Sequence, residues 1–171
     1  MSKAEITEEW FSSLSSNRKG EMGEGLAKTH LRSVVEEHPQ ILFPVFESVS
    51  PSSIYTQVRH RRHFTYEDVQ QDGSNERIQW QADLTIRLSN LYSDSDREVS
   101  RTVALEVKTG QYARLERDQQ KVMGIVNEND DYLVLRANVR FDADSVAEIQ
   151  YATLEPAPST KAGYRLSSYG L

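Results

Sequence analysis

The stretch Val103-Ala-Leu-Glu-Val-Lys-Thr-Gly-Gln111 places an acid and an amine two residues apart inside an alternating apolar run. Such alternation predicts a β-strand, in which successive side chains point to opposite faces. Glu106 and Lys108 therefore share one face, opposite the apolar residues. A carboxylate binds hard divalent metals, and a neighbouring ammonium can orient a water molecule or neutralise charge on a phosphate. The stretch predicts the chemistry of metal-dependent phosphodiester hydrolysis.

The composition favours one soluble globular domain. The chain has 171 residues, of which 37% are hydrophobic, enough for a sizeable core. We expect a single domain over residues 1–155, followed by a tail or last strand over residues 156–171. No apolar run reaches membrane-spanning length, so we expect a cytoplasmic protein without a membrane partner. The absence of cysteine excludes thiolate metal sites, so any metal must be held by oxygens or imidazoles.

The net charge of −6 conceals local groups of basic residues on either side of the predicted strand. These candidate nucleic-acid contacts are Arg59, Arg61, Arg62, Arg114, Arg117 and Lys121. Phosphate contacts require such local positive charge, because basic side chains displace the counterions of the nucleic acid. A solvated charged face is the alternative for each group. The acid-rich, lysine-poor composition would also suit a high-salt cytoplasm, where phosphate contacts are screened.

Helical spacing of apolar residues predicts a helix over residues 20–37, which His38-Pro39 ends. Glu24 lies near its start, at the edge of the apolar stripe or opposite part of it. Gly23 and Gly25 flank this acid, although each glycine weakens a helix by roughly 1 kcal/mol relative to alanine. Close approach of a ligand or another backbone would explain these glycines, and a frayed helix start is the alternative.

Two strands follow, and together they predict an acidic site. Residues 66–76 contain a turn signal that fits a hairpin or a loop. Residues 77–88 then alternate with all apolar side chains on one side, and residues 89–101 read as a polar connection. The simplest arrangement is an antiparallel pair that places Asp83 and Glu106 on the same sheet face. The register is not readable from sequence, and ordinary cross-strand charge pairs are the alternative.

The remaining segments complete an α/β chain. Residues 41–51 predict an edge strand or a structured loop, and residues 115–123 a short amphipathic helix. Residues 131–140 read as a core strand, and residues 146–154 as a further strand or a helix. The order of helix, strands, helix and strand predicts a mixed central β-sheet flanked by helices.

Four elements in this order resemble a known family. They are Gly23-Glu24-x-x-Ala27-x-x-x-Leu31, Asp83 in Ala82-Asp-Leu-Thr-Ile86, Glu106-Val-Lys108, and Gln119. This series is similar to the PD-(D/E)xK, or restriction-endonuclease-like, nuclease superfamily, and in order and spacing to archaeal Holliday-junction resolvases and related small nucleases. Ala82 stands where a proline often precedes the aspartate, a replacement that the family tolerates. The resemblance implies a restriction-endonuclease-like core.

The resemblance also implies a metal site. By similarity, Asp83 and Glu106 would coordinate one or two Mg²⁺ or Mn²⁺ ions, with the carbonyl of Val107 as a further ligand. Glu24 would add a ligand directly or through water, with Glu21 as a less favoured substitute.

Two more residues receive roles from the same resemblance. Lys108 would position the attacking water or stabilise the phosphate, and Gln119, or less favourably Gln120, would support Lys108 or touch the scissile phosphate. We therefore expect a metal-dependent DNA endonuclease, with junction or branched DNA as a candidate substrate. RNA is not excluded as a substrate, and a noncatalytic nucleic-acid-binding or assembly module with the same fold is the alternative. A junction substrate would call for a homodimer, because two strands must meet two sites.

Overall fold

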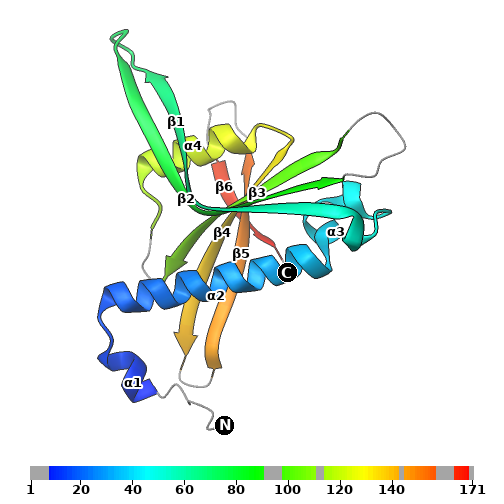
Figure 1. Ribbon diagram of the computed structural model, residues 1–171. Helices are drawn as coiled ribbons and strands as arrows, with labels where there is room; N and C mark the ends of the chain where they lie inside the picture. The colour runs from blue at the N-terminus through cyan, green and yellow to red at the C-terminus, as the bar shows by residue number, and fades with distance from the viewer. Residues whose placement is uncertain (1–7, 91–97, 111–113, 143–144, 157–163, 170–171) are drawn as a thin grey trace.

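A mixed sheet forms the centre of the computed structural model, which describes residues 8–90, 98–110, 114–142, 145–156 and 164–169 (Figure 1). In this described part the sheet has six strands, which follow one another in chain order. They are β1 (Ile54–Val69), β2 (Asn75–Asn90), β3 (Ser100–Thr109), β4 (Tyr132–Asp142), β5 (Ser145–Pro156) and β6 (Tyr164–Tyr169). Only β3 and β4 pair in parallel among these neighbours, as expected for two strands joined by a helix.

The helices flank this sheet, which confirms the predicted α/β class. They are α1 (Glu8–Ser13), α2 (Ser16–Glu37), α3 (Pro39–Leu42) and α4 (Arg117–Asn127). Two short 3₁₀ turns follow α3, namely η1 (Pro44–Phe46) and η2 (Pro51–Ser53). No helix in the described ranges is both long and apolar enough to cross a membrane.

Helical turns replace the edge strand that was one reading of residues 41–51, so that alternative is wrong. Pro39, Pro44 and Pro51 each begin one of these turns, at the position where a missing N–H removes no helical hydrogen bond. Phe43 and Phe46 are buried against the sheet and hold the segment in place.

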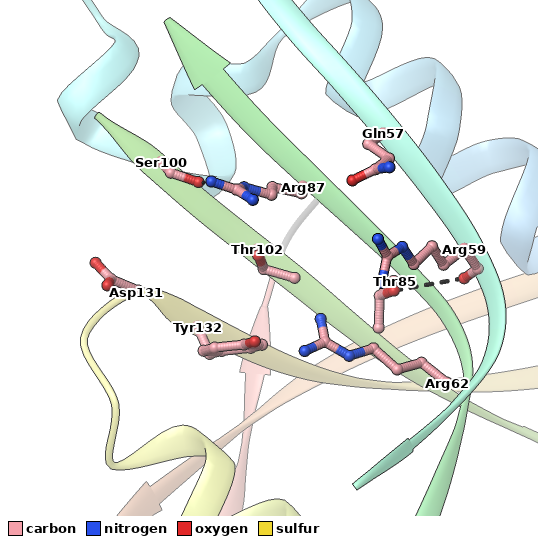
Figure 2. A pocket seen from close by; sticks show the side chains of 9 residues that line it. All are labelled: Gln57, Arg59, Arg62, Thr85, Arg87, Ser100, Thr102, Asp131 and Tyr132. Carbon is pink, nitrogen blue, oxygen red and sulfur yellow. Dashed lines mark hydrogen bonds between the residues drawn. The ribbon is translucent and has the colours of Figure 1, made fainter. Parts of the chain in front are cut away.

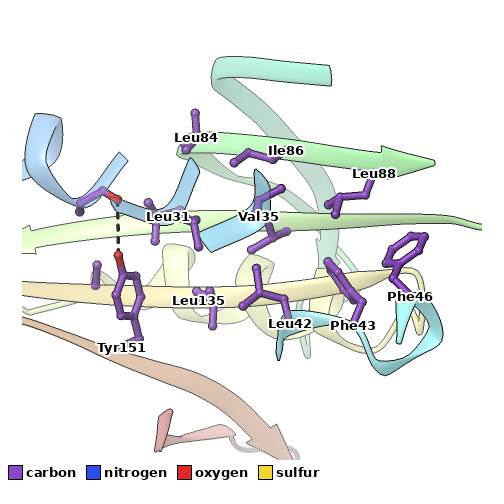
Figure 3. Packing of buried hydrophobic residues seen from close by; sticks show 14 of the residues in the cluster. Leu31, Val35, Leu42, Phe43, Phe46, Leu84, Ile86, Leu88, Leu135 and Tyr151 are labelled. Carbon is purple, nitrogen blue, oxygen red and sulfur yellow. Dashed lines mark hydrogen bonds between the residues drawn. The ribbon is translucent and has the colours of Figure 1, made fainter. Parts of the chain in front are cut away.

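Helix α2 covers one face of the sheet (Figure 3). Its buried stripe is Gly23, Ala27, Leu31 and Val35, spaced four residues apart. We call the apolar cluster on this face the α2-side core; its strand residues include Leu84, Ile86, Leu88, Val103, Leu105, Leu135, Ala137 and Val139. Glu24 follows the buried Gly23 directly, so it lies at the edge of the stripe that faces the sheet.

Helix α4 covers the opposite face. We call the cluster there the α4-side core; it joins Val122, Met123 and Val126 of the helix to Phe64, Ile78, Trp80, Ala82, Ala104, Val134 and Leu154. Both faces of β3 are therefore buried. The polar face that sequence alternation assigned to Glu106 is covered by α4 and the β1–β2 hairpin rather than by solvent.

The apolar residues of β2 divide between these two cores. The three nearest the hairpin turn pack under α4, namely Ile78, Trp80 and Ala82. The three in the half that pairs with β3 pack against α2, namely Leu84, Ile86 and Leu88. Alternation holds within each half, but the prediction of one common apolar side for the whole strand is wrong. The strand changes the face it presents at Asp83, between the two halves.

A backbone feature of β1 lies opposite this change. Arg61 has a φ of 53°, in the left-handed region, and lies between the paired residues His60 and Arg62. A non-glycine residue in this conformation carries a strain energy of order 1–3 kcal/mol, and such residues are concentrated at functional sites. The hairpin is bent in the same region (Figure 1). The bend carries the outer half of the hairpin over α4 and leaves Asp83 beside β3.

Candidate active site

Asp83 lies where β2 separates from β3. The antiparallel pairing of the two strands ends at Leu84 and Leu105, so the next opposed residues would be Asp83 and Glu106. Instead of continuing the backbone ladder, Asp83 Oδ2 accepts a hydrogen bond of 2.7 Å from the Val107 N–H. The predicted antiparallel pairing of the two strands is confirmed, whereas the shared face of Asp83 and Glu106 stays a prediction because the pairing ends one residue before them.

Glu106 is 3% exposed, and both of its carboxylate oxygens have partners. Oε2 accepts a 2.7 Å hydrogen bond from the indole N–H of Trp80. Oε1 lies 2.8 Å from the Lys108 ammonium and 3.2 Å from the Gln119 amide nitrogen. A buried carboxylate is tolerated only with such compensation, because desolvation of an unpaired charge is very unfavourable.

Gln119 connects this carboxylate to the start of α4. Its Oε1 accepts hydrogen bonds from the Glu116 backbone N–H at 3.1 Å and from Lys108 Nζ at 3.4 Å. Glu116 and Gln119 together form a capping box, which satisfies backbone donors at the helix N-terminus. The cap therefore fixes the amide that contacts both Glu106 and Lys108. Gln120, the substitute considered for Gln119, is exposed and bonds the Leu115 carbonyl instead.

Helix α2 brings Glu24 to the same region. An added Cβ on Gly23 would lie 2.2 Å from the Thr109 hydroxyl oxygen, so the glycine permits close approach of α2 to the end of β3. A Cβ on Gly25 would meet nothing within 4 Å, so only one of the two predicted glycines has this packing reason. Glu24 forms an ion pair with Lys28 one turn later. Glu21, the alternative acid, is exposed.

The electrostatics of Asp83 show that these carboxylates interact. Burial, together with the negative charges of Glu106 and Glu24, raises the pKa of Asp83 to about 6. The Val107 hydrogen bond and the Lys28 charge act in the opposite direction. Two cations, Lys28 and Lys108, thus accompany three acids at one place on the molecule.

Arg136 adds a further cation on the α4 side. It lies beside Glu106 in the parallel register of β3 and β4. Burial lowers the pKa of its guanidinium, and the charge of Glu106 counteracts part of that effect.

The ligand atoms that the site offers are suited to a hard divalent cation. Asp83 and Glu106 provide carboxylate oxygens, and relief of the repulsion that raises the pKa of Asp83 would favour a bound cation. The N–H and C=O of one strand residue point to the same edge, so the Val107 carbonyl lies on the edge that faces Asp83. Within the described ranges, no three His, Cys, Asp or Glu side chains already form a metal-holding group. Water and a phosphate oxygen would have to complete the coordination.

The first predicted basic group is divided by the hairpin bend. Arg59 and Arg62 line a pocket on the α4-side face of the sheet (Figure 2). Arg61, at the bend itself, is exposed and does not line this pocket.

The second basic group lies around the start of α4. Arg114 and Arg117 are exposed. Lys121 is paired with Asp68 of β1, and that contact, with Arg117 nearby, lowers the pKa of the Asp68 carboxyl. Lys121 therefore joins the hairpin to α4, and a phosphate contact would compete with this ion pair. Nucleic-acid contacts by these residues stay predictions.

Three residues of the site were not predicted from the sequence, namely Trp80, Lys28 and Arg136. Lys28 had a signal, because an acid and a lysine four residues apart on a helix form a favourable pair. Trp80 read only as an apolar position of an alternating strand. Nothing local distinguishes Arg136, because its position beside Glu106 depends on the pairing of β3 with β4.

The comparison with protein families agrees with this geometry. A family model described as a PD-(D/E)XK nuclease superfamily domain matches residues 19–147, well over half of the chain. The chain belongs to the PD-(D/E)XK nuclease superfamily, which confirms the family predicted from its motifs. A search of curated proteins and a search of solved structures each found no match.

Proposed function

We propose that the protein is a metal-dependent endonuclease that hydrolyses DNA phosphodiester bonds at the site formed by Asp83, Glu106 and Lys108. The observation that carries the proposal is the convergence of these residues where β2 separates from β3. Superfamily membership supports a nuclease. The same geometry would also act on RNA, so DNA is proposed from the resemblance to junction-resolving nucleases.

Asp83 and Glu106 would hold the cation, with the Val107 carbonyl beside them and Glu24 close enough to interact electrostatically with Asp83. A bound divalent cation supplies Lewis acidity toward the phosphate and makes water acidic enough to attack at neutral pH. Binding would require Glu106 to share oxygens that now accept from Lys108, Gln119 and Trp80.

Lys108 is the group of this chain best placed to act on the reacting phosphate. Its ammonium is held at 2.8 Å from Glu106 Oε1 and at 3.4 Å from Gln119 Oε1, so two fixed acceptors set its position. An ammonium with three donors can orient a water molecule and also stabilise charge that grows on phosphoryl oxygens. Gln119 is a positioning residue in this scheme, because it restrains both Lys108 and Glu106.

The test is cleavage of labelled four-way junction, flap, duplex and single-stranded DNA with Mg²⁺, Mn²⁺ or EDTA over a range of salt. We expect metal-dependent cutting by the wild type. We expect losses of about 10²–10³-fold in Lys108→Ala, comparable to removing one donor that stabilises transition-state charge. Asp83→Ala should also lose cutting. The matched control is Asp130→Asn, an exposed acid outside the site.

Cutting that needs the metal and is lost only in the two site variants would support the proposal, and the preferred DNA would show whether the enzyme is selective for junctions. Cutting that survives both variants would contradict it. If folded wild type cuts nothing under any metal or salt condition, the noncatalytic nucleic-acid-binding module becomes the better interpretation.

A further inference from the structure

A pocket of about 290 Å³ opens on the α4-side face of the sheet, apart from the carboxylate site (Figure 2). Three arginines from two strands line it, namely Arg59 and Arg62 of β1 and Arg87 of β2. Two buried hydroxyl side chains, those of Thr85 and Thr102, also line it. Its volume is close to the lower end of the range for small-ligand pockets, roughly 300–1,000 Å³.

The pocket carries an excess of positive charge. Asp131 is the one carboxylate among its lining residues, and it is paired with Arg101 at 2.9 Å. Arg87 lies 3.9 Å from Glu98, and both side chains are more than half exposed, so this ion pair is weak. The Nε of Arg87 donates to Ser100 at 2.7 Å, which fixes the direction of its guanidinium.

Two of the arginines have no carboxylate partner within the described ranges. Arg62 lies over the ring of Phe64 at 4.8 Å and near that of Tyr132 at 5.7 Å. Stacking on an aromatic face holds a guanidinium plane in place while its N–H edges stay available. Arg59 forms no ion pair with the described acids, and its side chain points toward the pocket (Figure 2).

The bend of the hairpin explains how these two arginines meet. Residues three apart on a regular strand point to opposite faces, yet Arg59 and Arg62 line the same pocket. Arg61, with its φ of 53°, interrupts the alternation between them. The backbone conformation that lies opposite Asp83 therefore also assembles the arginine pocket.

Strand β2 connects the pocket to the candidate active site. Thr85 and Arg87 line the pocket, and Asp83 lies two residues before Thr85, where the strand changes the face it presents. The Cα atoms of Asp83 and Arg87 are roughly 13 Å apart by strand geometry. Phosphates on one strand of a duplex recur about every 3.4 Å along the axis, so this separation spans several phosphates.

We propose that the arginine pocket binds a phosphate group of the nucleic-acid strand whose scissile phosphate occupies the carboxylate site. The inference rests on the proposed nuclease function. Guanidinium groups bind phosphate through paired charge-assisted hydrogen bonds, and the Thr102 hydroxyl adds a neutral donor, whereas the Thr85 hydroxyl donates to the Arg59 carbonyl at 3.5 Å. Because no base edge is needed for such contacts, the pocket positions the strand without reading its sequence.

The experiment measures binding of labelled single-stranded and duplex DNA by fluorescence anisotropy, in EDTA so that no cutting occurs. Arg59→Ala is the main variant, because this side chain has no ion pair in the described structure to lose on folding. Arg87→Ala is the second variant. The matched control is Arg140→Ala, an exposed arginine of β4 outside the pocket. Circular dichroism checks that each variant is folded.

We expect each pocket variant to bind DNA about tenfold more weakly than the wild type, with a slope of log affinity against log salt that is shallower by about one. The control should bind as the wild type does. Equal binding by Arg59→Ala, Arg87→Ala and Arg140→Ala would overturn the proposal. Inorganic phosphate and a mononucleotide serve as separate ligands; if they bind in an Arg59-dependent way and the strands do not, the pocket takes a free phosphate compound and the proposal is also overturned.

Failure of this inference is distinguishable from failure of the proposed function. A protein that cuts DNA but binds it independently of Arg59 would reject the pocket alone. A protein that shows Arg59-dependent binding but no cutting would reject the nuclease activity alone.

Discussion

The two faces of strand β3 have different chemical environments, although their residues alternate along one backbone. Leu105 faces α2 and lies within an apolar cluster, whereas Glu106 faces α4 and is buried with Trp80, Lys108 and Gln119. An apolar core stabilises by area removed from water, while a buried charge must be compensated contact by contact. The comparison indicates that Leu105 contributes to stability, whereas Glu106 belongs to the candidate active site.

The largest effect on stability should come from the α2 side. Leu105 is fully buried, so Leu105→Ala should lower the free energy of unfolding by about 2–5 kcal/mol through lost burial and a residual cavity. We expect the cleavage rate per folded molecule to stay at the wild-type level. Urea denaturation and single-turnover cleavage on the same preparation measure the two quantities. A loss of cutting in the folded fraction would show that the two sides are not separable.

The next effect tests the approach of α2 to the site. Gly23→Ala places a methyl group 2.2 Å from the Thr109 hydroxyl oxygen and should destabilise by about 1–3 kcal/mol. Gly25→Ala, two residues later, meets open space and should instead stabilise the helix by about 0.5–1 kcal/mol. Thermal unfolding of both variants gives the comparison.

Thr109→Ala provides a cross-check on the Gly23 contact. It removes the two nearest atoms from the clash, so the double variant should recover part of the stability lost in Gly23→Ala. If Gly23→Ala and Gly25→Ala change the stability equally, the close contact is not what requires the glycine.

The smallest effect concerns the charge of Asp83. Its pKa in the folded protein is raised from 3.8 to about 6, so the folded state binds the proton more tightly than the unfolded chain does. The corresponding stability is complete below about pH 4 and is lost as the pH rises through about 6. In EDTA, Asp83→Asn should therefore exceed the wild type in stability by about 1–2 kcal/mol above this range, after allowance for partial exposure.

The pH dependence of that difference is the decisive part of the test. The stability gap between Asp83→Asn and the wild type should close as the pH falls to about 4, where the native carboxyl is also neutral. Urea denaturation from acid to neutral pH measures it, with Asp130→Asn as an exposed control that should show no such gap. A gap of constant size would mean that burial of charge at Asp83 is not its cause.

Local pattern was sufficient for the strand pair that contains the site. Alternation predicted β2 and β3, a polar connection predicted their antiparallel pairing, and the spacing of four motifs identified the superfamily. The predicted polar residues 93–96 of that connection lie outside the described residues. Residues 146–154, left between strand and helix, belong to β5, and residues 164–169 form β6 beside it.

Sequence did not predict where the faces of the strands would lie. The change of face at Asp83 depends on the backbone conformation of Arg61, a residue 22 positions earlier in the chain. Nothing in the sequence distinguishes Arg61 from other exposed basic residues. The burial of Glu106 depends on how the hairpin and α4 close over β3. Alternation therefore predicted the face on which Glu106 lies, but it did not predict that α4 and the hairpin cover that face. Trp80 and Arg136 meet Glu106 only through that tertiary arrangement.

The most direct test is the cleavage rate of Glu106→Gln, with Leu105→Ala as the adjacent residue on the opposite side of the same strand. We predict that Glu106→Gln stays folded and loses metal-dependent cutting, whereas Leu105→Ala loses stability and cuts normally once folded. Wild-type cutting by folded Glu106→Gln would contradict the proposed role of Glu106 in metal-dependent cleavage.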